Sequence, residues 1–441
     1  MTVLASDDVL RAPGAVIEIA RTLREAGYET WCVGGAVRDA LLGVSSLDWD
    51  LATAAPPKSV LRLFRRTVPV GIEFGTVGVL DAAGVMHEVT TFRRDVSTDG
   101  RHAVVEFGAS LDDDLARRDF TINAIAFDPI SRKLHDPFGG RRDLSSRLVR
   151  AVGDAEARLE EDRLRALRAI RFASRFDFEI EPATWSAIVG SAPYLSRLSP
   201  ERVKQEIEKT MDQVRLPSRA LALWRDAGAF ASLVPVLATV SNDILLAVDR
   251  LPTPSLRGRP GRRSLRIAAL FSNAGGVATT ESLRALRFSN ADVAWVTGLV
   301  NAWERFGRSL AAQLLATEPP TDAELRPLAA AIGRLRVLPF LRLAAARWSV
   351  LPTGEAPTPE RVRTLFRQLA RIAFNDAIEV SDLVIDGDDL RSVGIPAGPV
   401  YGRIFAAALS AVIADPSFND RANLLAMAKT FVVTESEGRG R

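Results

Sequence analysis

Apolar residues recur at helical and at strand-like spacings along the first third of the chain. Residues 13–26 place an apolar side chain every three or four positions and are followed by Gly27, which predicts an amphipathic helix. Short apolar runs predict strands at residues 28–33, 49–53, 76–80, 87–92 and 124–128, with a further helix at residues 36–42. Residues 1–140 therefore read as an α/β or α+β domain.

The pattern changes after residue 150. Strand-like runs fade, and long amphipathic segments rich in Ala, Leu and Arg predict helices from residues 156–175 onward. Segments rich in Pro and Gly interrupt them at residues 251–263, 318–321, 351–358 and 394–399. The remainder of the chain is thus expected to be all-helical and divided into several parts.

Composition narrows the class of protein. The 441 residues are 47% hydrophobic and 25% charged, and the net charge of +3 permits a nucleic-acid partner without requiring one. The single cysteine, Cys32, excludes an internal disulfide and is expected in the core. No apolar run reaches the length of a membrane span, and the N-terminal segment carries acids where a signal peptide is basic. We expect a soluble cytoplasmic protein with no membrane partner.

Asp48 and Asp50 are the first candidates for chemistry. Residues two apart on a strand point to the same face, and two carboxylates there repel unless a cation lies beside them. Mg²⁺ suits such a pair, because it takes hard oxygen ligands and completes its shell with water and substrate phosphates. The other interpretation of the pair is a solvated turn.

A Gly-Gly turn lies just upstream, in Val33-Gly34-Gly35-Ala36-Val37-Arg38-Asp39. Glycine lets the backbone approach a phosphate, and the turn opens a predicted helix N-terminus, which attracts anions. A paired-Asp metal site beside a phosphate turn indicates phosphoryl or nucleotidyl transfer. A tight turn without a ligand is the structural alternative.

Two later segments strengthen this interpretation. Arg117-Arg118-Asp119 precedes an apolar strand: two arginines can neutralise a triphosphate, and the carboxylate can accept a hydrogen bond from a ribose hydroxyl. A helix N-terminus with an Arg–Asp ion pair explains the same residues without a ligand.

In the second segment, Asp162 and Arg165 share a helical face that Arg168 and Arg171 extend. An acceptor beside a donor matches cytosine and adenine, which show an amine beside a ring acceptor, and leaves uracil and guanine mispaired. A salt-bridged surface helix is the alternative.

Together these segments resemble the class II tRNA nucleotidyltransferase/poly(A) polymerase family, within the polymerase-β-like nucleotidyltransferases, and most closely its bacterial CCA-adding members. The resemblance is strong over about the first 210 residues and resumes weakly near residues 387–399. It also rests on Gly71-Ile72-Glu73-Phe74-Gly75-Thr76-Val77 and Asp136-Pro137-Phe138-Gly139-Gly140. It implies an α+β fold, with a mixed or antiparallel sheet in a nucleotidyltransferase head and an all-α neck, body and tail. The implied boundaries are 1–145 for the head, 146–215 for the neck, 216–340 for the body and 341–441 for the tail.

The resemblance also implies roles. The substrates would be tRNA, CTP and ATP, and the reaction would be template-independent addition of CCA to the tRNA 3′ end by two-metal nucleotidyl transfer. Asp48 and Asp50 would be catalytic and hold Mg²⁺. The nucleotide would be bound at the triphosphate by Gly35, Arg38 and Arg118, at the ribose by Asp119, at the base by Asp162 and Arg165, and by Arg168 and Arg171 in support. Glu88 is a candidate third carboxylate, with a structural role equally open.

Departures from the family pattern leave alternatives. Phe74 stands where His is common, and Arg101-His102-Ala103 where Arg-Pro is common. A poly(A) polymerase is disfavoured, because those enzymes carry a Gly-Arg-Arg-Phe-Arg run where residues 70–76 stand here. A partial enzyme that adds only CC or only A, and a non-catalytic tRNA-binding relative, remain open, as does the oligomeric state.

Overall fold

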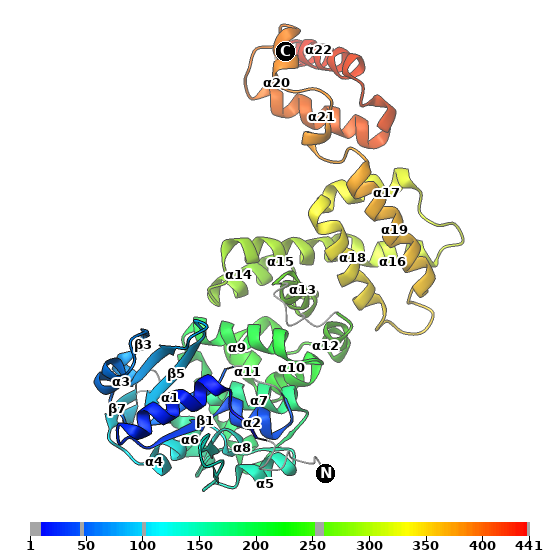
Figure 1. Cartoon of the computed structure of the whole chain (residues 1–441). Coiled ribbons are helices and arrows are strands. Elements are labelled where there is room, and N and C mark those ends of the chain that lie inside the picture. The colour runs from blue at the N-terminus through cyan, green and yellow to red at the C-terminus, as the bar shows by residue number, and fades with distance from the viewer. Residues whose placement is uncertain (1–9, 45–47, 99–102, 252–259, 439–441) are drawn as a thin grey trace. The chain divides into compact units, whose positions relative to one another are not determined.

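The computed structural model describes residues 10–44, 48–98, 103–251 and 260–438 (Figure 1). Arg101 and His102, one of the departures noted above, lie outside these ranges. The chain divides into two compact units, Met1–Ala238 and Thr239–Arg441. Each unit has its own helices and core and is described separately.

A mixed sheet forms the first part of unit 1, in the strand order β3-β4-β5-β2-β1-β8-β9. β2 and β5 run parallel, and the other neighbours run antiparallel, which confirms the expected α+β class. Its strands are β1 (Thr30–Val33), β2 (Asp50–Thr53), β3 (Thr67–Gly71), β4 (Thr76–Leu80), β5 (Met86–Thr91), β8 (Ala126–Phe127) and β9 (Leu134–His135). Two smaller pairs are β6 (Arg93–Thr98) with β7 (Ala103–Phe107), and β10 (Leu148–Val149) with β11 (Glu179–Ile180).

Short helices pack around this sheet. They are α1 (Gly14–Glu25), α2 (Gly35–Leu41), α3 (Pro57–Leu63), α4 (Leu111–Ala116) and α5 (Gly140–Ser145), with 3₁₀ turns η2 (Ile72–Phe74) and η3 (Thr121–Asn123). The apolar stripe of α1 is buried from Val16 to Leu23, as its spacing predicts. Cys32 is fully buried on β1, as expected for a core residue. Phe92, Leu111 and Leu115 belong to the core cluster that joins the sheet to α4.

Helices make up the rest of unit 1. They are α6 (Ala155–Glu161), α7 (Leu164–Phe176), α8 (Pro182–Ser191), η4 (Ala192–Arg197), α9 (Pro200–Gln213), α10 (Pro217–Asp226), α11 (Ala229–Leu233) and η5 (Pro235–Leu237). The expectation of one continuous helix over residues 156–175 is wrong, because the chain leaves the helical conformation at Asp162, whose φ is −150°. The Asp162 carboxylate accepts the N–H of Leu164 at 3.1 Å. A short acidic side chain that caps the next turn competes with helix continuation.

Unit 2 is all-helical within the described residues. Its elements are α12 (Asn242–Asp249), α13 (Pro260–Leu270), α14 (Gly276–Ala285), α15 (Asn290–Ala302), η6 (Trp303–Gly307), α16 (Arg308–Leu315), α17 (Asp322–Ile332), α18 (Arg334–Trp348), α19 (Pro359–Asn375), η7 (Val380–Asp382), α20 (Gly387–Ser392), α21 (Val400–Ala414), η8 (Pro416–Phe418) and α22 (Arg421–Gly438). Its C-terminal part has a separate core, with Leu390, Ile404 and Leu424 at its centre. None of the helices in the described ranges is long and apolar enough to cross a membrane. The finer division at residues 145, 215 and 340 stays a prediction.

The glycine that begins α5 makes the tightest backbone contact of the Asp136–Gly140 segment. A methyl group on Gly140 would lie 2.2 Å from the backbone oxygen of Thr121. The Ile125 side chain, at 2.8 Å, could shift, but the Thr121 backbone cannot yield alone, so the substitution must displace η3 or α5.

We therefore expect Gly140→Ala to lower the free energy of unfolding by about 1–3 kcal/mol, the usual effect of overpacking a tight site. Gly190→Ala is the matched control: nothing lies within 4 Å of the added methyl group, and Ala is favoured over Gly in a helix by up to about 1 kcal/mol. Denaturant unfolding of both variants checks the pair. A Gly140→Ala protein as stable as the Gly190→Ala protein would contradict the close packing of α5 on η3.

Candidate active site

The Gly-Gly turn connects β1 to α2. Gly34 has a φ of +78°, a conformation that glycine adopts without strain, and α2 begins at Gly35. A Cβ on Gly34 would lie 3.1 Å from Nη1 of Arg118, so the guanidinium sits against this turn. Nη2 of Arg118 bonds to Asp114 at 3.0 Å, whereas its buried Nε finds no hydrogen-bond partner among the described residues. A guanidinium whose Nη1 lies beside a glycine turn suits a phosphate oxygen.

Strand register brings Asp50 of β2 and Glu88 of β5 to the same place, and Asp48 lies just before β2. Asp50 pairs with Val33 across β2 and β1, directly before the Gly34 turn. Leu51 pairs with Val89 on the parallel strand β5, so Glu88 precedes that pair as Asp50 does, on the same face. Burial, then the charges of Asp48 and Glu88, raise the pKa of Asp50 to about 7, with Arg118 acting in the opposite direction. The site therefore carries more negative charge than its own cations offset.

This donor set fits a divalent cation. Carboxylate oxygens are hard ligands, and a cation between Asp48 and Asp50 would relieve the repulsion that raises the pKa of Asp50. In the part of the chain that the structure describes, no group of three His, Cys, Asp or Glu side chains is arranged for a metal ion. Two carboxylates agree with the way Mg²⁺ is usually held, because water and substrate phosphates complete its shell.

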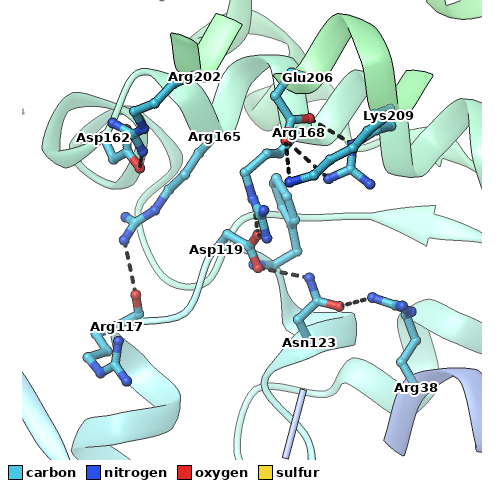
Figure 2. Close-up of polar contacts among 12 residues, drawn as sticks. Arg38, Arg117, Asp119, Asn123, Asp162, Arg165, Arg168, Arg202, Glu206 and Lys209 are labelled. Atoms are coloured by element: carbon cyan, nitrogen blue, oxygen red, sulfur yellow. Dashed lines mark hydrogen bonds and ion pairs between the residues drawn. The ribbon is translucent and has the colours of Figure 1, made fainter. Parts of the chain in front are cut away.

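Asp119 is the centre of a second group of polar residues (Figure 2). Its Oδ1 accepts hydrogen bonds from the Phe120 N–H and the Asn123 Nδ2, both at 2.8 Å. Its Oδ2 accepts from Arg168, at 2.9 Å from Nε and 2.6 Å from Nη2. Burial by itself would raise the pKa of this carboxyl, but Arg168 and these hydrogen bonds outweigh it and lower the pKa to about 2. Asp119 is therefore ionised, and all of its roughly four acceptor positions are occupied.

Asp162 and Arg165 bond to different partners in this structure. Asp162 accepts from Nη2 of Arg202 at 2.7 Å. Arg165 donates to Glu161 at 2.7 Å and to the backbone oxygen of Arg117, just after α4, at 3.1 Å. The prediction that the two residues share one helical face is wrong, because α6 ends at Glu161 and α7 begins at Leu164. Their proximity depends instead on the turn at Asp162.

Arg38 and Arg171 are the two arginines among the predicted nucleotide contacts that the structure buries, each at 3% exposure. Arg38 pairs with Asp39 at 2.6 Å and lies over the ring of Phe176, 4.7 Å from its centroid. Arg171 pairs with Glu206 of α9 at 2.7 Å. Both guanidiniums thus support the walls of the site, and their contact with a nucleotide stays a prediction.

Sequence reasoning missed several residues at this site. Asn123 lies in the Arg117–Ala124 stretch that the sequence singled out, but nothing in the pattern indicated that its amide would join Arg38 to Asp119. Arg202 and Glu206 lie on α9, about 40 residues after the segment they contact, and look like an ordinary i, i+4 surface pair. Only the packing of α9 against α7 gives them their roles.

Comparisons with known proteins agree with this geometry. Residues 30–150 match the family described as "Poly A polymerase head domain", and residues 177–240 match "Probable RNA and SrmB- binding site of polymerase A". The CCA-adding enzyme of Geobacillus stearothermophilus is 36% identical over 413 residues, which are 92% of this chain and 94% of that protein. The CCA-adding enzyme of Geobacillus kaustophilus is 34% identical over 418 residues, with the same two coverages.

Solved structures give the same result. The Bacillus stearothermophilus CCA-adding enzyme in complex with CTP superimposes with a TM-score of 0.75 at 32% identity, over 96% of this chain and 98% of that one. The Thermotoga maritima CCA-adding enzyme complexed with tRNA shares the fold, with a TM-score of 0.64 at 21% identity over 98% of this chain and the whole of the other. Since more than nine-tenths of both chains align at 36% identity with a curated member, this chain belongs to the CCA-adding enzyme family of nucleotidyltransferases.

Proposed function

We propose that this protein adds C, C and A to the 3′ end of tRNA, with CTP and ATP as substrates and without a nucleic-acid template. The observation that carries the proposal is the junction of β1, β2 and α2. There Asp50 lies beside the Gly34 turn, and Nη1 of Arg118 lies against the same turn. Nucleotidyl transfer needs a carboxylate pair for a metal ion beside a glycine turn and a guanidinium that can bind phosphate. The tRNA 3′-hydroxyl is the acceptor that family membership indicates.

Asp48 and Asp50 are the residues proposed to hold the metal. Nucleotidyl transfer in this family depends on a divalent ion, and Mg²⁺ is our choice because the ligands are carboxylates. When bound, Mg²⁺ lowers the pKa of an attacking hydroxyl and neutralises charge on the phosphates. Arg118 and the backbone at Gly35 bind the triphosphate, so that the α-phosphate is held beside the two carboxylates.

Arg168 and Asp119 bind the sugar in this proposal. A ribose hydroxyl can bond to Asp119 only if one of its four donors yields. Arg168 is the most exposed donor, with 31% of its side chain accessible, whereas Asn123 and Phe120 are buried. Arg168 therefore gives up part of its contact with Asp119 and turns toward the nucleotide when the nucleotide binds.

Asp162 and Arg165 read the base. Asp162 uses two of its roughly four acceptor positions on Leu164 and Arg202, and Arg165 uses three of its five N–H donors. About two acceptor positions and two donors thus remain, enough to pair with the amine and ring nitrogen of cytosine or adenine. Uracil and guanine would leave buried polar groups unpaired. Arg171 acts behind them by holding α7 to α9 through Glu206.

The helical parts of the chain bind tRNA in this proposal. Shape and phosphate contacts, rather than base sequence, would carry the affinity, because double-helical RNA offers few readable base edges. We assign the tail, residues 341–441, to this role and place the protein in the cytoplasm, where tRNA is matured. The two remaining catalytic alternatives are addition of CC only or of A only.

The direct test is incubation with tRNA that ends before its CCA, with Mg²⁺ and with CTP and ATP separately and together. We expect complete CCA addition with both nucleotides, a CC product with CTP alone, and no product with UTP or GTP. Asp50→Asn keeps the shape of the side chain but removes its charge, and should abolish addition while tRNA binding is retained.

Other outcomes of this assay separate the alternatives. Products that stop at CC, or that need CC already present, indicate a partial enzyme. A long run of A indicates a poly(A) polymerase. If tRNA binds without incorporation, the chain is a non-catalytic relative, and near-normal addition by Asp50→Asn contradicts the metal assignment.

Base selection should depend on Asp162 and Arg165. Asp162→Ala removes an acceptor for the exocyclic amine, so we expect the preference for CTP over UTP to fall by about tenfold or more, the range for one unpaired buried group. Competition assays with all four nucleotides measure it. Arg163→Lys, in the same turn, is the matched control and should keep the preference. Intact discrimination in both Asp162→Ala and Arg165→Ala would place base reading elsewhere.

Removal of the C-terminal core should impair tRNA binding. A chain that ends at Asn375, the last residue of α19, loses the cluster around Leu390 and Leu424 but keeps every nucleotide-binding residue. We expect tRNA affinity about tenfold lower or worse, CTP binding unchanged, and full-length binding that weakens steeply as salt rises. Titrations at low and physiological salt measure this. Equal tRNA affinity of the two proteins would assign the tail to folding or assembly instead.

A further inference from the structure

Asn123 is a buried amide in the middle of a chain of polar contacts that joins two helices of unit 1 (Figure 2). Its Oδ1 accepts from Nη1 of Arg38, at 2.5 Å, and its Nδ2 donates to Oδ1 of Asp119, at 2.8 Å. Arg38 belongs to α2, which follows the phosphate turn. Asp119 bonds in turn to Arg168 of α7. One side chain thus links the helix at the phosphate end to the helix that carries the sugar and base contacts.

Arg38 needs a hydrogen-bond acceptor from Asn123, and Asp119 needs a donor from it. A guanidinium can only donate, and the ionised carboxylate of Asp119 can only accept. The amide supplies an acceptor on one side and a donor on the other, so its orientation is fixed. Aspartate in its place would set a second carboxylate against Asp119, and leucine, of similar shape, would offer neither group.

Arg38 and the backbone of Asn123 are both held firmly in place. Arg38 is held by Asp39 and lies over the rings of Phe172 and Phe176 of α7, 5.1 and 4.7 Å from their centroids. The backbone of Asn123 is held in η3, where its N–H bonds to the Phe120 oxygen at 2.9 Å. A shift of the amide therefore moves Asp119 and Arg168 rather than Arg38.

The amide is also a neutral spacer. Arg38 and Asp119 are opposite charges in a buried environment, where their attraction is stronger than in water. Without Asn123 between them, the Asp119 carboxylate gains by turning toward Arg38 and away from Arg168. The nucleotide-facing arginine would then lose the partner that orients it.

We propose that Asn123 is a positioning residue, which sets Asp119 and Arg168 at the distance from the phosphate turn that one nucleoside triphosphate spans. The inference rests on the proposed function. Beyond that function, we infer that Asn123 controls how much the nucleoside adds to the affinity of the triphosphate. Asn123 need not touch the nucleotide to do so.

The test compares Asn123→Leu with Thr121→Val in the full-length protein. Thr121 lies in the same turn, is equally buried and bonds to Asp143 at 2.7 Å, so its variant also loses a buried hydrogen bond but leaves Arg38 and Asp119 untouched. Calorimetric titration with CTP, ATP and inorganic triphosphate, without tRNA, gives the affinities. Thermal unfolding records the loss of stability in each variant.

We expect Asn123→Leu to bind CTP and ATP about 10- to 100-fold more weakly, as for a lost buried hydrogen bond to a charged group. Its affinity for inorganic triphosphate should change by less than about twofold, because Arg118 and the Gly34 turn are unaffected. Thr121→Val should bind all three ligands as the unchanged protein does. In an Arg168→Ala background, Asn123→Leu should have little further effect on CTP affinity, because the two act as a unit.

Two outcomes overturn the inference. One is CTP affinity in Asn123→Leu equal to that in Thr121→Val. The other is an equal loss for CTP and for inorganic triphosphate, which indicates general damage to the fold. If Asn123→Leu does not fold, Asn123→Ser, which is smaller and still polar, is subjected to the same comparison. Failure of the proposed function looks different, because the unchanged protein would then bind CTP yet add nothing to tRNA.

Discussion

The ion pair between the buried Asp119 and the half-buried Arg168 is the interaction on which the arrangement of unit 1 depends. The two residues are 49 positions apart, and their 2.6 Å contact ties the segment after α4 to α7. A buried carboxylate is stable only when its charge and its acceptor positions are compensated. Asp119 meets that condition with donors from Phe120, Asn123 and Arg168, which is why its pKa falls to about 2. The orientation of α7, and of the residues proposed to read the base, follows from this pair.

Asp50, the first residue of β2, is the opposite case. Burial and the nearby charges of Asp48 and Glu88 raise its pKa to about 7, and Arg118 offsets them only in part. One carboxylate of unit 1 thus has its charge fully compensated within the protein, and another has not. The uncompensated site lies beside the turn against which Nη1 of Arg118 packs, while Nη2 of the same guanidinium pairs with Asp114. The negative charge that the protein leaves uncompensated therefore lies where metal and phosphate are proposed to bind.

Local patterns predicted much of the fold and failed where long-range contacts decide. The strand at residues 76–80 and the helix at 13–26 were read from apolar spacing almost to the residue, because their buried faces follow a strict period. β3 was missed because it contains Pro69 and its central residues are exposed, so it shows no alternation. The break at Asp162 was missed because a single capping side chain overrides a long stretch of good helix formers.

The sequence by itself determined the chemical inventory: a carboxylate pair after a Gly-Gly turn, an Arg-Arg-Asp segment and an Asp–Arg pair, each tied to its neighbours by a few residues. Their resemblance to a known family gave the fold class and the substrates that the comparisons support. Only the tertiary structure decided which arginines are free to meet a ligand. Arg38 and Arg171 look like Arg118 and Arg168 in sequence, yet packing against Phe176 and Glu206 buries them. Phe176 is 138 residues from Arg38 and Glu206 is 35 residues from Arg171, and no local pattern encodes contacts at such separations.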